Sequence, residues 1–215
     1  MPALGGRHSW AHDCRHGRVL INNHSPSGLI VWDPITGDKQ HLSEPAYPYS
    51  YSTAAVLCAV DDCHHLDCHG GPFRVVFVGS NTNNMEYVIW VSMYSSEIGT
   101  WSALTSIQTD YCIEGKPTLL IGNSLYFTPE QGTKFLTYDL AGHELSEIDT
   151  PSVFGAIVVE AKDRGLGYIA SWTVAFIYCQ SRMVLLVLLD LDGQNSGLSS
   201  LRHYYLKETH GFHTI

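Results

Sequence analysis

The sequence predicts an all-β fold of short antiparallel strands in repeats, a partial β-propeller of about four blade-like units. Residues 119–151 carry the clearest pattern, because short apolar or alternating runs are separated there by turn residues such as Gly122 and Gly142. These runs predict three or four strands, which form too small a sheet to bury both of its own faces. Such a sheet needs similar neighbours. No long amphipathic helix pattern is found in the chain.

The neighbouring units are indicated by a turn-forming segment that recurs along the chain. It begins with an aromatic or apolar residue and ends in glycine, as in WDPITG at 32–37, YSSEIG at 94–99, YDLAG at 138–142 and, less clearly, LDLDG at 189–193. The first half of the unit also recurs, as GRVLI at 17–21 and GNSLY at 122–126. Irregular repeats of roughly 45 residues with short strands are typical of β-propeller blades. A β-sandwich with similar hairpins is the alternative.

In chain order, the first two units contain the strongest strand signals. The expected strands of the first unit are 18–22, 29–32 and 39–42, with a turn at 33–38. An extended connector at 43–52 follows, and the expected strands of the second unit are 53–60, 73–79, 87–95 and 100–104. Residues 73–79 are expected to form a buried central strand.

The third unit has expected strands at 125–127, 134–140 and 144–148, and the fourth at 154–160, 166–178 and 183–190. The period-2 alternation predicts that Leu125, Phe127, Val75, Phe77 and Ile30 are buried. The predicted organisation is a disordered N-terminus at 1–12, one propeller-like domain at 13–193 and a poorly patterned tail at 194–215. Because the fourth unit decays after Gly193, we expect an unclosed ring with exposed strand edges, poor solubility and loose packing of residues 196–215.

Composition excludes several classes of partner. The net charge is −9, with only 12 Lys and Arg residues, so a nucleic-acid partner is not expected. The longest apolar run covers only residues 183–189, far short of a membrane span. No signal-peptide pattern is found near the first residues, so we expect an intracellular protein, cytoplasmic or nuclear, whose six cysteines are free thiols.

Four segments occur together in a familiar order. They are CRHGRVL at 14–20, VWDPITG at 31–37, GPFRVVFVG at 71–79 and YSSEIGTW at 94–101. In this order they resemble the F-box-associated β-propeller domain of plant F-box proteins, most closely that of the large grass families. Residues 122–127 and 138–151 also look like that domain, and the resemblance covers roughly residues 13–180.

The resemblance implies a function in protein recognition. In that family an N-terminal helical F-box docks on the Skp-type adaptor of a cullin ubiquitin ligase, and the propeller recruits the substrate protein. No F-box-like helical pattern precedes Cys14. We therefore expect this chain to bind a protein substrate, and to bind the adaptor only when an F-box is supplied upstream.

One loop is rich in potential metal ligands. The group consists of Cys58, Cys63, His64, His65, Cys68 and His69. Thiolate and imidazole are the ligands that zinc prefers, but this spacing matches no standard zinc motif. The aspartates Asp61, Asp62 and Asp67 fit a solvated connector instead. We therefore expect that the loop 61–72 holds no metal, and we expect no other cofactor.

The chain shows no pattern typical of catalysis. Paired carboxylates do not converge, and neither a Gly-x-Ser-x-Gly segment nor a phosphate-binding glycine loop is found. The predicted function is therefore non-catalytic protein recognition. The alternatives are a carbohydrate-active enzyme on a propeller scaffold and a truncated fragment without independent function.

Loops are the expected contact sites, because β scaffolds bind partners through the segments between strands. The candidate protein-binding residues are Tyr47, Tyr49, Tyr51, Asn83, Asn84, Glu130 and Gln131.

Overall fold

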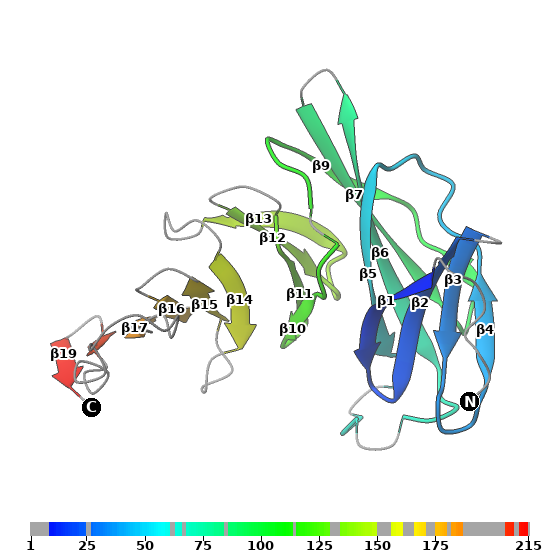
Figure 1. Ribbon diagram of the computed structural model, residues 1–215, viewed down its shortest axis with the longest axis horizontal. Coiled ribbons are helices and arrows are strands. Elements are labelled where there is room, and N and C mark those ends of the chain that lie inside the picture. Colours follow the sequence, from blue (N-terminus) through cyan, green and yellow to red (C-terminus); the bar gives the residue numbers. More distant parts are fainter. Residues whose placement is uncertain are drawn as a thin grey trace, which may run out of the picture. The chain divides into compact units, whose positions relative to one another are not determined.

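The chain folds into antiparallel strands throughout the part that the computed structural model describes, which confirms the predicted all-β class (Figure 1). The described residues are 9–24, 27–60, 63–65, 68–83, 86–113, 115–129 and 134–149, followed by six short strands between 156 and 214. Within these ranges, no helix is long and apolar enough to cross a membrane. The chain divides into two compact units, Met1–Thr118 and Leu119–Ile215, and the predicted propeller-like domain over 13–193 stays a prediction.

The first sheet of Met1–Thr118 is a four-stranded meander. Its strands are β1 (Ser9–Arg15), β2 (Arg18–His24), β3 (Ser27–Trp32) and β4 (Lys39–Leu42), paired in that order. The strands β2, β3 and β4 were predicted, but β1 was not, and residues 9–11 pair with β2 where a disordered end was expected. The sequence SWAHDCR lacks the apolar alternation from which a strand is recognised.

The second sheet is built around a long hairpin. Its strands are β5 (Tyr51–Cys58), β6 (Phe73–Asn83), β7 (Glu86–Ser95), β8 (Thr100–Trp101) and β9 (Thr105–Thr109). Both β8 and β9 pair with the same edge of β7. This is possible because β8 is only two residues long and leaves the first half of β7 free to pair with β9. The predicted strand 100–104 therefore ends early, and β9 was not predicted.

An apolar core joins these two sheets. Its buried residues are Leu20, Leu29, Val31 and Leu42 of the first sheet and Ala54, Val56, Phe73, Val75, Phe77, Trp90 and Tyr94 of the second. The predicted burial of Val75 and Phe77 is confirmed. The prediction for Ile30 is wrong, since Ile30 is only half-buried. Its neighbours Leu29 and Val31 face the core, and successive residues of a strand face opposite sides.

Leu119–Ile215 begins with a third meander. Its strands are β10 (Leu119–Ile121), β11 (Ser124–Phe127), β12 (Lys134–Asp139) and β13 (Glu144–Asp149), paired in chain order. Leu125 and Phe127 are buried as predicted. On this sheet, Ile121 and Phe135 pack against Leu166 from a later strand.

The predicted fourth unit is divided between two sheets. One contains β14 (Ala156–Glu160) and β15 (Leu166–Ala170), and the other β16 (Ala175–Cys179), β17 (Arg182–Leu186), β18 (Tyr205–Glu208) and β19 (Gly211–Thr214). The predicted strand 166–178 is thus two strands, because a continuous apolar pattern does not mark where a strand ends. The expected poorly patterned tail includes β18 and β19. Its loose packing, the unclosed ring and the poor solubility stay predictions.

The repeated sequence segments occupy equivalent places in two meanders. Gly17 and Gly122 lie between the first and second strands, with φ of 72° and 57°, which glycine adopts without steric cost. Asp33 and Asp139 begin the turn between the third and fourth strands, and each carboxylate accepts an N–H group from its own turn. The recurrence in the sequence therefore marks a recurrence of structure.

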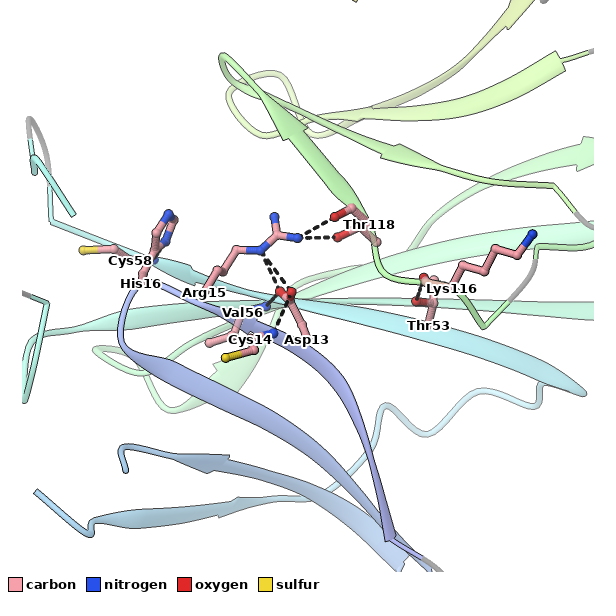
Figure 2. Close-up of polar contacts among 9 residues, drawn as sticks. All are labelled: Asp13, Cys14, Arg15, His16, Thr53, Val56, Cys58, Lys116 and Thr118. Atoms are coloured by element: carbon pink, nitrogen blue, oxygen red, sulfur yellow. Dashed lines mark hydrogen bonds and ion pairs between the residues drawn. The ribbon is translucent and has the colours of Figure 1, made fainter. Parts of the chain in front are cut away.

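Asp13 connects the two sheets of Met1–Thr118 (Figure 2). Its carboxylate accepts the N–H of Val56 on β5 and that of Cys14, each at 2.9 Å, and pairs with Arg15 Nε at 2.8 Å. Arg15 in turn donates to the carbonyl and hydroxyl oxygens of Thr118. Burial raises the pKa of Asp13, and the Arg15 charge and the two N–H donors act against that rise.

Replacing Asp13 should destabilise the chain according to how many of these contacts are lost. Asp13→Ala leaves the N–H of Val56 buried without an acceptor and Arg15 without its counter-charge, at a cost of about 3 kcal/mol in the free energy of unfolding. Asp13→Asn keeps one acceptor oxygen and should cost about half as much. Urea denaturation measures both variants, and an Asp13→Ala variant as stable as the wild type would contradict this role.

A β-bulge at His12 explains why Asp13 points toward β5. Ala11 pairs with Ile21, but Asp13 pairs with Leu20, so the register of β1 against β2 shifts at His12. A bulge breaks the alternation of a strand and redirects a side chain. As a result, the consecutive residues His12 and Asp13 are both buried.

The stability contributed by His12 should fall as the pH falls from about 6.5 to about 4. Burial lowers the pKa of His12 to about 4, and its Nε2 lies 3.2 Å from the amide nitrogen of Asn22. The unfolded chain takes up the proton first, so acid favours unfolding within this window by up to about 3 kcal/mol. Between pH 7 and pH 4.5, His12→Gln should lose about 2 kcal/mol less stability than the wild type in urea titrations. An equal loss in both would disprove the assignment.

Gly79 should not tolerate a side chain. It lies opposite Trp90 in the β6–β7 ladder, and an added Cβ would stand 2.4 Å from the indole ring, which is fully buried. Gly79→Ala should therefore lower the free energy of unfolding by about 1–3 kcal/mol. At Gly115 an added Cβ would lie 3.6 Å from the Ser52 carbonyl oxygen, an ordinary contact. Gly115→Ala is thus the control, and thermal unfolding should separate the two variants.

Candidate functional site

A cavity of about 560 Å³ opens at one end of the two packed sheets of Met1–Thr118. Its walls are the β3–β4 turn, the β7–β8 turn and the segment that leads into β6. The lining residues are Arg18, Val31, Asp33, Asp38, Lys39, Gln40, Gly70, Gly71, Pro72, Phe73, Ser96 and Glu97. The volume lies in the range of sites that hold a small molecule or a side chain of a partner.

Asp33 builds the first turn of the cavity wall. Its Oδ1 accepts the N–H groups of Ile35 at 2.9 Å and Thr36 at 3.2 Å, and His69 Nδ1 lies 3.1 Å from its Oδ2. Burial acts to raise the pKa of Asp33, but these two N–H donors and His69 hold it below its usual value. The carboxylate is thus engaged in shaping the turn, and Ile35 remains 73% exposed at the tip.

The second turn is held by different groups. The N–H of Ser96 donates to the Phe73 carbonyl at 3.0 Å, and the N–H of Phe73 donates to Ser96 Oγ at 2.8 Å. Gly99 closes the turn with an N–H bond of 2.8 Å to the Ser95 carbonyl. Ile98 is 76% exposed at this tip. Each of the two turns that contribute to the cavity wall therefore also presents one isoleucine to solvent.

The charges around the cavity are unequally available to a partner. Arg18 is buried in the wall, where it donates to the Gly71 carbonyl and lies 5.4 Å from the centre of the Phe73 ring. Asp38 and Glu97 are exposed on the two turns. The accessible rim next to the isoleucines is therefore weighted toward carboxylates, although Lys39 is also exposed there.

The segment leading into β6 also carries the group of potential metal ligands. Cys58, Cys63, His65 and Cys68 each place one ligand atom so that all four atoms lie within 4.8 Å of one another. The spacing of Cys63 and Cys68 alone gave no zinc motif, but Cys58 at the end of β5 supplies a further thiol. His64 is outside this group, and His69 contacts Asp33 instead.

The predicted contact residues do not line this cavity. Tyr51 pairs with Ser80 near the far end of β6, so residues 47–51 lie toward the same end of the sheet as Asn83. The cavity is at the opposite end of β6, where Phe73 begins the strand. Asn84, Glu130 and Gln131 lie outside the described residues.

The three predicted tyrosines differ in what they offer a partner. Tyr47 and Tyr51 are 43% and 50% exposed. Tyr49 is only half-buried but packs on the core, with its ring centre 5.3 Å from that of Phe77 and 6.2 Å from that of Trp90, and Tyr47 also meets Trp90 edge-on, at 5.4 Å between ring centres. Tyr47 and Tyr51 thus remain candidates for contact, whereas Tyr49 supports the core.

Sequence reasoning did not identify Ile35 and Ile98 as surface residues. The available signal was a large apolar residue inside each polar turn segment, where no core can cover it. Comparison of the chain with protein-family models finds no match, and comparison with curated proteins finds no matching relative. A functional assignment therefore rests on the site itself.

Proposed function

We propose that this chain is a non-catalytic protein-recognition module that binds its partner at the cavity between the β3–β4 and β7–β8 turns. The observation that carries the proposal is the pair of isoleucines, Ile35 and Ile98, exposed by 73% and 76% on the two turns that form the rim. Large apolar side chains fixed beside a cavity and bordered by polar groups are typical of protein interaction sites.

The site favours a partner segment with apolar and basic side chains. A partner segment that lies across the two turns would cover Ile35 and Ile98, and a lysine or arginine in that segment would meet Asp38 and Glu97 at the cavity. The turns are fixed by the hydrogen bonds of Asp33 and Ser96. Less ordering is then required on binding, which increases affinity.

The resemblance to the F-box-associated domain supplies a biological context for this proposal. In that context the partner is a substrate protein delivered to a cullin ubiquitin ligase. The Skp-type adaptor would be bound only through an F-box joined to this chain. The cavity would serve substrate recognition and no step of catalysis.

Selection from a random peptide library against the immobilised full chain tests the proposal. Enriched peptides should combine a large apolar residue with lysine or arginine. Their affinity, measured by calorimetry, should fall at least about tenfold in Ile35→Asp with Ile98→Asp, because truncation or charge at a central contact removes the largest part of the binding energy.

Tyr47→Ser with Tyr51→Ser is the matched control, since it alters two exposed aromatic residues at the opposite end of the sheet. Affinity should be unchanged in this control. Loss of binding in the tyrosine variant with retention in the isoleucine variant would move the site to the predicted loops. Enrichment of acidic peptides, or of none, would refute the proposed site.

A further inference from the structure

Four side chains at the end of β5 and in the segment before β6 have the geometry of a metal site. Cys63 Sγ lies 3.4 Å from Cys68 Sγ, and Cys68 Sγ lies 3.6 Å from His65 Nδ1. Cys58 Sγ completes the group, with all four ligand atoms within 4.8 Å of one another. A tetrahedral zinc ion with Zn–S near 2.3 Å and Zn–N near 2.0 Å holds its ligand atoms about 3.5–3.8 Å apart. We propose that Cys58, Cys63, His65 and Cys68 bind one zinc ion as a structural site.

The chemistry of the donors selects zinc. Three thiolates and one imidazole form the Cys3His set of structural zinc sites, which have no open position for a substrate. Soft sulfur ligands exclude magnesium and calcium, which prefer oxygen. On binding, the ion replaces the thiol protons, which pass to solvent, and no oxidation or reduction is required.

Backbone N–H groups support two of the sulfur atoms. The N–H of Val60 points to Cys58 Sγ and that of His65 to Cys63 Sγ, each at 3.4 Å. In both cases the donor is the second residue after the cysteine. Such contacts to the ligand atoms orient the side chains that bind a metal. The positions of both sulfur atoms are therefore supported by the backbone.

The surrounding structure holds the other two ligands. Cys68 is buried, with 5% of its surface exposed. His65 has a φ of 56°, an uncommon backbone conformation for a residue with a side chain, which persists only where the surroundings fix it. Its ring stacks on that of His16 at 3.9 Å between centroids, and His16 itself accepts the N–H of Cys58 at 2.9 Å.

A disulfide between Cys63 and Cys68 is the rival explanation for their proximity. Their sulfur atoms are 3.4 Å apart, whereas a disulfide requires about 2.05 Å. A disulfide would also leave Cys58 and His65 without a reason to converge. The zinc ion accounts for all four groups and would tie the end of β5 to the segment carrying Gly70 and Gly71.

Metal analysis of the full chain, purified under reducing conditions, tests the site independently of the proposed protein partner. The wild type should contain about one zinc per chain, and Cys63→Ser with Cys68→Ser at least about tenfold less. His64→Gln and Cys14→Ser are matched controls, since both residues are exposed and lie outside the cluster. Both controls should retain zinc. A zinc-free wild type, or zinc retained by the double variant, would overturn the proposal.

A second measurement uses only the wild type, because loss of a ligand can unfold the chain. Alkylation mapped by mass spectrometry should modify Cys58 and Cys63 at least about tenfold faster after chelator treatment than with zinc bound. Cys14, which is exposed, should react equally in both states. Equal reactivity of Cys58 and Cys63 in both states would overturn the proposal, as would a Cys63–Cys68 disulfide in the freshly purified chain.

Discussion

The buried carboxylate of Asp13 holds together parts of the first unit that no strand ladder joins. The ladders join strands within each sheet only, so the two sheets are held together by their apolar faces and by side chains that cross between them. Asp13 crosses from β1 to the N–H of Val56 on β5, 43 residues away in the chain. Through Arg15 the same network reaches Thr118, a further partner separated by 103 residues. The apolar core is non-directional, whereas these contacts fix the register of one sheet against the other.

Much of the fold follows from local sequence patterns, and the exceptions have identifiable causes. Turn residues and alternation locate β2 to β4, β6, β7 and β11 to β13 to within a few residues. They do not locate β1, because the bulge at His12 turns two consecutive polar residues inward. Ile30 was assigned to the wrong face because a run of apolar residues such as LIVW does not state which members face the core. The contacts of Asp13 with Val56 and Arg15 depend on the tertiary structure, so no local sequence pattern predicts them.

The candidate sites were less accessible to sequence reasoning than the fold. The loop 61–72 was recognised as a group of thiols and imidazoles, but the strand β5 delivers Cys58 and the stacking on His16 orients His65. The spacing of residues along the chain predicts neither the position of Cys58 nor the orientation of His65. Ile35 and Ile98 were visible as apolar residues in turns, yet only the packing of the two sheets brings both turns to one cavity. Sites assembled from several strands thus require the pairing of strands to be known first.

The contact between Arg15 and Thr118 joins two segments of the first unit that are far apart in the sequence. Arg15 ends the unit's first strand and Thr118 is the unit's last residue, so the first strand and the last residue of the unit meet in space (Figure 2). A permuted chain that opened between β4 and β5 would therefore need a linker from Thr118 that runs the length of β1 to Ser9, and with such a linker it could form the same ladders, the same core and the same buried carboxylate. The order of the sheets along the chain is a matter of connectivity and is separable from the contacts that stabilise them.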